Sequence, residues 1–178
     1  LLADPDFYSV VAERDGAIVA SNFLDMRGPI VGVGPISVLP EMQNVGLGRQ
    51  LMQNVLDRFE TSRRPGVRLY TAAHNTRTVS LYSKLGFSIR GAAIVVHGPP
   101  LGEQQKDGSR AHLHVRVARP EDLPASKRLC MRVHGHDRDR ELAQAVQQGT
   151  ARVVERAGGI VGYATSLSFA GHALGHKN

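Results

Sequence analysis

Residues 38–49 read VLPEMQNVGLGR, which is the end of an apolar strand, a short glycine-containing turn and the start of a helix. The helix is predicted from an apolar stripe at helical spacing, made of Leu47, Leu51, Met52, Val55, Leu56 and Phe59. Such a helix leaves its first backbone amides without intrahelical partners, and its dipole adds partial positive charge there. Gly46 and Gly48 allow a ligand to approach the backbone, and Arg49 adds a formal charge. The stretch therefore predicts a phosphate or pyrophosphate site, with an ordinary glycine turn as the alternative.

The turn is not a Walker loop, because no Gly-Lys-Ser/Thr follows, and it lacks the three spaced glycines of a dinucleotide fingerprint. Its pattern, Gln43-x-x-Gly46-x-Gly48, resembles the acyl-CoA pyrophosphate loop of the GNAT N-acetyltransferase superfamily. Residues 75–87, which read NTRTVSLYSKLGF, resemble the helix that follows the fifth strand of that family. The matching positions are Asn75, Leu81, Tyr82, Lys84, Gly86 and Phe87.

Composition limits the classes of function. The chain has 178 residues, of which 42% are hydrophobic, enough for one domain and part of another. No apolar run approaches the length of a membrane span, and no signal pattern opens the chain. The single cysteine, Cys130, cannot build an internal disulfide framework, so a reducing cytoplasm is the expected location. The net charge of +6 comes from scattered basic residues, so nucleic acid is not the expected partner.

Alternating strands and helices are predicted for the first half of the chain. Asp15-Gly16 is a favoured pair for a type I′ turn between two strands. The next strand, residues 30–39, is nearly continuously apolar and predicted to be central, with a bulge or bend at Gly32, Gly34 and Pro35. The other predicted strands are 7–14, 17–26, 67–72 and 87–96, of which 67–72 is parallel to the central strand. The predicted helices are 47–61 and 75–85.

A repeat predicts the organisation of the second half. The segment ERDGAIV at residues 13–19 recurs as ERAGGIV at residues 155–161, 142 residues further on. Strand 113–118 and helices 121–134 and 137–148 precede the second copy. With the resemblance, this predicts a GNAT core without its opening strand and helices (1–98), a linker (99–111) and the N-terminal half of a second GNAT-like unit (112–178). The chain resembles a fragment of a tandem-GNAT protein.

The expected fold class is therefore mixed α+β, with a central, mostly antiparallel sheet flanked by helices and a partial second unit. Two arrangements of the second unit remain open. Residues 112–150 could fold back and complete the first sheet, because they supply the element types that the first unit lacks. Alternatively, the C-terminal portion packs loosely on its own.

The resemblance also implies an acetyl-CoA site and an acetyl transfer to an amine. Tyr82 matches the position of the family's general acid, and Asn75 would contact pantetheine or position the amine. The resemblance assigns cofactor binding to Ile36, Ser37, Val38, Gln43, Asn44, Val45, Gly46, Leu47, Gly48, Arg49, Asn75 and Tyr82. Local structure alone would explain Asn75 as a helix N-cap and Tyr82 as a core residue.

The general base is the weakest part of this interpretation. The resemblance implies a Glu base on the fourth or fifth strand. Residues 30–38 contain no carboxylate, and Tyr70 stands at the corresponding position of the fifth strand. His74 is the nearest group that titrates near neutral pH, and a water chain could serve instead. The histidine pairs 112/114 and 134/136 lack the acidic or cysteine ligands of a zinc set, so no metal is expected.

Two functions of different class follow. The first is an acyl-CoA-dependent N-acyltransferase acting on a small-molecule or peptide amine, with no membrane partner. The second is a catalytically silent acyl-CoA-binding or regulatory module, which the absent carboxylate base favours. The assembly remains open between a homodimer and an intramolecular pair of GNAT units.

Overall fold

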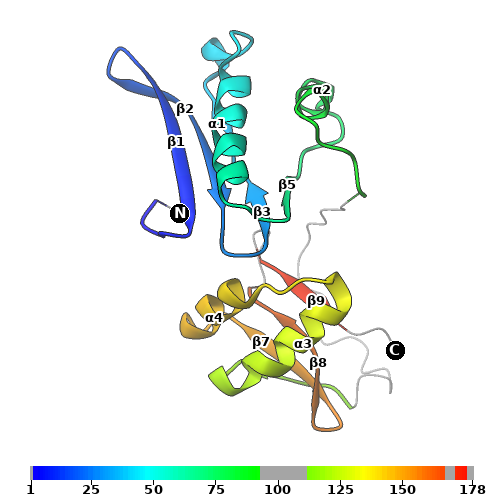
Figure 1. Cartoon of the computed structure of the whole chain (residues 1–178). Coiled ribbons are helices and arrows are strands. Elements are labelled where there is room, and N and C mark those ends of the chain that lie inside the picture. Colours follow the sequence, from blue (N-terminus) through cyan, green and yellow to red (C-terminus); the bar gives the residue numbers. More distant parts are fainter. Residues whose placement is uncertain (1, 93–111, 167–170, 176–178) are drawn as a thin grey trace, which may run out of the picture. The chain divides into compact units, whose positions relative to one another are not determined.

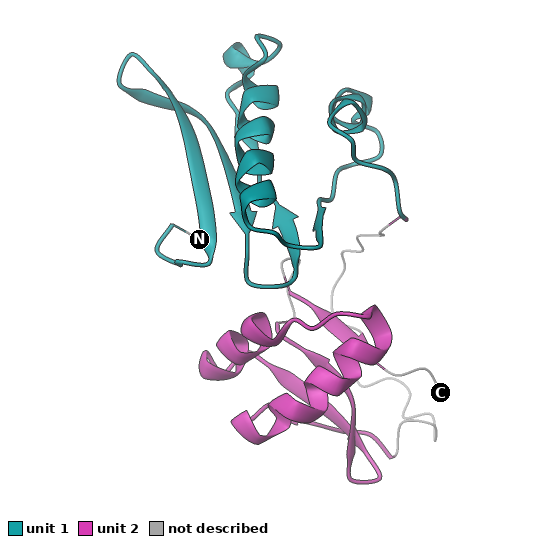
Figure 2. Ribbon diagram, in the orientation of Figure 1, with its two compact units in different colours: residues 1–90 teal, residues 91–178 magenta. Residues whose placement is uncertain are grey.

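The computed structural model describes residues 2–92, 112–166 and 171–175. The chain forms two compact units, residues 1–90 and residues 91–178, which are coloured separately in Figure 2. Each unit has its own sheet and its own hydrophobic core. The mixed α+β class with mostly antiparallel sheets, expected from the sequence, is confirmed.

The first unit is built on a mixed sheet (Figure 1). Its strands run in the order β1-β2-β3-β5, and β4 also pairs with β2. All pairs are antiparallel except β3 with β5. The elements are β1 (Phe7–Arg14), β2 (Ala17–Asp25), β3 (Ile30–Val33), β4 (Ser37–Val38), a 3-10 turn (Pro40–Met42), α1 (Leu47–Thr61), β5 (Gly66–Arg68) and α2 (Thr76–Lys84).

The predicted hairpin and the long helix are confirmed. Asp15 (φ 53°) and Gly16 (φ 78°) both have positive φ, as a type I′ turn requires. The apolar stripe of α1 packs on one face of the hairpin, where Leu24, Val31 and Val55 are fully buried.

The predicted strand at residues 30–39 is divided into β3 and β4. Gly34 adopts a φ of 116° and Pro35 has no backbone N–H, so the ladder is interrupted at these two residues. The parallel strand is also shorter than predicted and ends at Arg68. Residues 87–92 form no strand, and the remainder of the strand predicted at 87–96, together with the linker 99–111, lies outside the described residues.

The second unit has a four-stranded antiparallel sheet in the order β6-β7-β8-β9. The first strand of this unit, β6, pairs with β7 of the same unit. The elements are β6 (His114–Val117), a 3-10 turn (Pro120–Asp122), α3 (Leu123–His134), α4 (Asp139–Gln147), β7 (Arg152–Arg156), β8 (Gly159–Ala164) and β9 (Ala173–Gly175).

The sequence repeat is also a structural repeat. The β1–β2 hairpin shifts register between Ala12 and Glu13, and the β7–β8 hairpin shifts between Val154 and Glu155. These positions are again 142 residues apart. The second turn also has two successive residues with positive φ, Ala157 and Gly158. The two hairpins therefore share turn, bulge and pairing.

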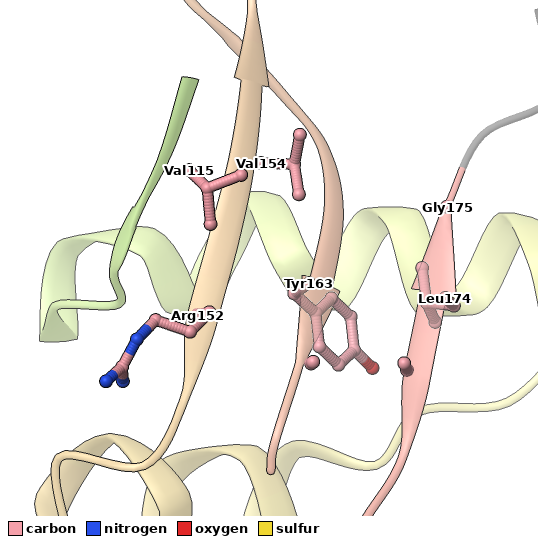
Figure 3. A pocket seen from close by; sticks show the side chains of 8 residues that line it. Val115, Arg152, Val154, Tyr163, Leu174 and Gly175 are labelled. Atoms are coloured by element: carbon pink, nitrogen blue, oxygen red, sulfur yellow. The ribbon is translucent and has the colours of Figure 1, made fainter. Parts of the chain in front are cut away.

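Helices cover opposite faces of the two hairpins. In the first unit α1 packs on the face of Tyr8, Val10 and Leu24, whereas Val11 on the other face is 48% exposed. In the second unit α3 and α4 pack on the face of Val153, the counterpart of Val11. The face of Arg152 and Val154 is instead hollowed by a cavity of about 450 Å³, lined by Val115, Arg152, Val154, Tyr163, Ala164, Ala173, Leu174 and Gly175 (Figure 3).

Candidate functional site

The turn between β4 and α1 presents free backbone donors. Gly46 is the N-cap of α1 in the left-handed conformation (φ 87°), and its carbonyl accepts the first helical hydrogen bond from the Gln50 amide at 3.1 Å. Within the described part of the chain, the amides of Leu47, Gly48 and Arg49 donate to no protein acceptor. Residues 43–46 of the turn are exposed. The local geometry thus agrees with an anion site at this helix N-terminus.

The strand before this turn has an unpaired edge. The Leu39 amide donates to the Val19 carbonyl at 3.0 Å, so the alternation of an antiparallel ladder directs the N–H and C=O of Val38 away from β2. β3 pairs with β5, but among the described residues β4 pairs with β2 alone, so the sheet opens beyond the interruption at Gly34. The Gln43 side chain donates to the Val38 carbonyl at 3.2 Å and closes the turn.

Helix α2 begins at the predicted N-cap. The Asn75 side-chain oxygen accepts a hydrogen bond from the Thr78 amide at 3.2 Å. This satisfies one of the orphan donors of the helix, so the capping role is present. Asn75 is exposed, and its side chain is therefore also accessible from solvent.

Tyr82 lies on the same helix and is buried, with 7% of its surface exposed. Its ring contacts the edge of Phe87, with centroids 6.1 Å apart. Burial raises the pKa of the Tyr82 hydroxyl, because the ionised phenolate would lose its hydration. The hydroxyl donates to no side chain or carbonyl among the described residues, and at neutral pH it carries its proton.

His74, the predicted candidate base, lies exposed in the segment between β5 and α2. No described residue forms a hydrogen bond with its imidazole. Tyr70, at the fifth-strand counterpart of the missing carboxylate, is 77% exposed. The structure therefore gives His74 no partner that would orient it, and its catalytic role stays a prediction.

Sequence reasoning missed the contact that joins the two motifs. Arg77, in the first turn of α2, donates from Nη1 to Oδ1 of Asn44 at 2.9 Å. Asn44 lies in the turn before α1 and has a φ of 67°. The available signal was a basic residue at a helix N-terminus without an acidic neighbour. No local pattern could connect it to a residue 33 positions away.

The second unit carries an ion cluster outside these motifs. Arg116 donates to both Asp122 oxygens, at 2.7 and 2.8 Å, and to Glu155 at 2.5 Å. The hydrogen bonds from Arg116 lower the pKa of Asp122. The Asp122 carboxylate also accepts from the Arg119 amide, so the cluster fixes the start of α3. Its groups are mutually paired, which is typical of a structural role.

The described residues hold neither a metal-binding cluster nor a helix able to span a membrane. They contain no cluster of three or more His, Cys, Asp or Glu side chains arranged to bind a metal ion. None of the described helices combines the length and apolarity needed to cross a bilayer. The hollow in the second sheet contains none of the residues predicted for the cofactor site.

A family model and several curated relatives match this chain. The sequence model of the acetyltransferase (GNAT) family matches residues 1–87. A mycothiol acetyltransferase of Arthrobacter sp. (strain FB24) is 33% identical over 105 residues, covering 56% of this chain and 32% of the relative. A mycothiol acetyltransferase of Cellulomonas flavigena is 34% identical over 128 residues, covering 66% of this chain and 35% of the relative.

The chain thus spans about a third of the length of these curated relatives. Among solved structures, a transcriptional regulator from Bacillus halodurans C-125 matches with a TM-score of 0.50 at 16% identity, over 55% of this chain and 69% of that chain. This match is a similarity of fold alone. The family match covers the part of the chain that carries both motifs, and residues 1–87 are thus a GNAT acetyltransferase domain.

Proposed function

We propose that the chain binds acetyl-CoA and transfers its acetyl group to an amine by direct attack. The observation that carries the proposal is the set of unpaired amides at Leu47, Gly48 and Arg49, next to the unpaired edge of β4. The amides would hold the diphosphate, and the Val38 carbonyl, which already accepts a hydrogen bond from Gln43, would accept a second one from pantetheine. The remaining cofactor residues are those assigned above from the resemblance.

The reaction needs one new bond and one broken bond. The amine nitrogen attacks the thioester carbonyl carbon, which forms the C–N bond and places negative charge on the carbonyl oxygen. The Val38 N–H is the donor suited to that oxyanion. The C–S bond then breaks, its electron pair stays on sulfur, and the thiolate takes the proton of Tyr82. Burial raises the pKa of Tyr82, so the hydroxyl carries its proton at neutral pH and can donate it, but the same shift makes it a weaker acid toward the thiolate.

The amine must also lose a proton, and His74 or a water molecule is proposed to accept it. His74 is exposed and has no orienting partner among the described residues, which favours water. Without an oriented base, the enzyme would act best on amines that are already neutral. The rate should then rise with pH as the ammonium form of the acceptor loses its proton.

The second candidate is a silent acyl-CoA-binding module. The observation that favours it is the absence of a carboxylate in strands β3 to β5. Both candidates require the cofactor site, and they differ in chemistry alone.

The first experiment is a thermal-shift titration of the 178-residue chain with acetyl-CoA. A ligand that binds the native state raises the melting temperature. At a ligand concentration of 100 Kd it adds about 2.7 kcal/mol to the free energy of unfolding. Release of free CoA is then measured with a panel of amines. Binding with CoA release supports the transferase, and binding without release from any amine supports the silent module. No shift with acetyl-CoA would refute both.

Replacement of Tyr82 by Phe tests the proposed acid. The ring contact with Phe87 survives this substitution, and the hydroxyl has no hydrogen bond to lose among the described residues. Turnover should fall by about 10²–10⁴-fold, the usual contribution of general acid catalysis, with little change in acetyl-CoA affinity. Unchanged turnover would remove Tyr82 from the mechanism.

The name of the relatives indicates which acceptor to test first. Mycothiol acetyltransferase activity is the first activity to assay, alongside protein N-termini, polyamines and aminoglycosides. For the domain organisation we propose a GNAT core (1–98), a linker (99–111) and the N-terminal half of a second GNAT-like unit (112–178). The matching bulges of the two hairpins support this proposal.

A further inference from the structure

Arg77 is unusual because its position does not favour the helix that carries it. It is the second residue of α2, where the positive end of the helix dipole disfavours a cation. No acidic side chain in that first turn offsets its charge. α1 likewise has Arg49 in its first turn and no acidic residue there. Two helices of the first unit thus begin with a cation and without an acid.

The partner of Arg77 is equally unusual. Asn44 has a φ of 67°, a conformation that side-chain-bearing residues adopt rarely and that asparagine tolerates best. Its side-chain oxygen, Oδ1, accepts the hydrogen bond from Arg77 at 2.9 Å, so this contact reaches outside the turn. Gly46, two residues later, has a φ of 87°. The conformation that exposes the α1 amides therefore depends on two left-handed residues, one of which Arg77 holds.

This hydrogen bond is also the link between the two motifs. Among the described residues, the other side-chain hydrogen bonds of α2 stay within residues 71–78. The contacts at its C-terminal end join Leu85, Gly86 and Phe87 to the same helix. The bond from Arg77 to Asn44 therefore ties the helix of Tyr82 to the turn before α1.

We propose that Arg77 is a positioning residue, which locks the turn 43–49 through Asn44 and thereby sets the helix of Tyr82 against that turn. The inference rests on the proposed function, because it assigns a purpose to the contact within the cofactor site. A diphosphate bound at the α1 amides stabilises the same turn conformation. Cofactor binding and the placement of Tyr82 are then coupled through this contact.

The test uses Arg77→Ala, Asn44→Gly and the double variant in the 178-residue chain. Glycine replaces Asn44 because it adopts the positive φ of this position without strain. Each single substitution should weaken acetyl-CoA binding about tenfold, the scale of a lost hydrogen bond to a charged group. The double variant should bind no worse than either single variant, because both remove the same interaction. Turnover at saturating acetyl-CoA should fall as well, since Tyr82 loses its placement. The proposal would be overturned if the affinity losses of the two single variants multiplied in the double variant. A change in KM without a change in turnover would also overturn it.

Truncated donors separate a positioning role from a direct ligand contact. Binding of acetyl-3′-dephospho-CoA should suffer the same loss in the Arg77→Ala variant as binding of acetyl-CoA. If the loss disappears with the dephospho donor, Arg77 contacts the 3′-phosphate and the positioning role is refuted. Lys84→Ala is the matched control, because it removes the same charge from the last turn of α2 and should change affinity less than twofold.

A measurement without ligand keeps the inference separate from the proposed function. In hydrogen–deuterium exchange of the free protein, Arg77→Ala and Asn44→Gly should accelerate exchange in the first turn of α2 to the same extent. Lys84→Ala should affect the last turn of α2 alone. Unchanged exchange would refute the positioning role even if acetyl-CoA binds. Accelerated exchange in a chain that binds no acetyl-CoA would refute the cofactor site and leave the link between turn and helix established.

Discussion

Substitution of Gly46 and of Gly48 by Ala should have opposite effects on the first unit, although the two positions are two residues apart. Gly46 has a φ of 87°, whereas Gly48 lies inside α1 without a positive φ. A Cβ at either position meets no atom within 4 Å, so neither substitution causes a clash. Any difference between the variants is therefore conformational.

The magnitudes follow from backbone preferences. An L-residue in the left-handed conformation costs about 1–2 kcal/mol, partly offset by a less flexible unfolded chain, so Gly46→Ala should destabilise by roughly 1 kcal/mol. Gly48→Ala should instead stabilise by about 0.5–1 kcal/mol, as Ala does within a helix. For a unit of residues 1–90, each kcal/mol corresponds to about 4–8 °C in Tm.

Hydrogen–deuterium exchange of α1 peptides measures this stability without interference from the second unit. Gly46→Ala should accelerate exchange in α1 and Gly48→Ala should slow it. Acetyl-CoA affinity should fall about fivefold for Gly46→Ala, the equivalent of 1 kcal/mol in turn conformation. If both variants shift α1 in the same direction, the left-handed cap at residue 46 is wrong and with it the geometry of the amides.

Three further predictions concern stability. Asn75→Ala should destabilise α2 by about 1 kcal/mol through loss of its N-cap, seen as faster hydrogen exchange in that helix, and Asn75→Asp should retain the cap. Leu24→Ala should lower the free energy of unfolding by about 2.7–5 kcal/mol in urea titration, since Leu24 is fully buried, whereas Val11→Ala at a 48% exposed position should be nearly neutral. Asp122 has a pKa lowered by Arg116, so the folded state favours its ionised form; that stability is present above the ordinary aspartate pKa and is lost as the pH falls through the lower folded value. Asp122→Asn should remove this acid sensitivity of the second unit, and an unchanged pH dependence would contradict the assignment.

The sequence predicts the turns and helices whose structure depends on residues within the same segment. The turn at Asp15-Gly16 and the bounds of α1 follow from residues that contact each other within a few positions. The sequence predicts one strand at residues 30–39 with a bulge or bend at Gly32, Gly34 and Pro35, but it does not reveal that backbone pairing stops there. Its division depends on which neighbours remain within reach after Gly34.

The candidate site shows the same limit. The amide cradle was predicted because it needs only a turn and a helix in succession. The Arg77–Asn44 contact was missed because it depends on the placement of α2 beside the turn, which no periodicity encodes. The orientation of the Val38 edge also required the strand register, in particular the bond from Leu39 to Val19.

The shared hairpin geometry makes the two halves of this chain candidates for recombination. Their turns, bulges and pairing coincide, and helices cover opposite sides of the two ribbons. A chimera that passes from residues 112–156 into residues 15–92 at the common turn would carry α3 and α4 on one side of its sheet and α1 on the other. Such a protein would acquire both outer layers from a single crossover, while keeping the turn at residues 43–49 and the helix of Tyr82 on one polypeptide.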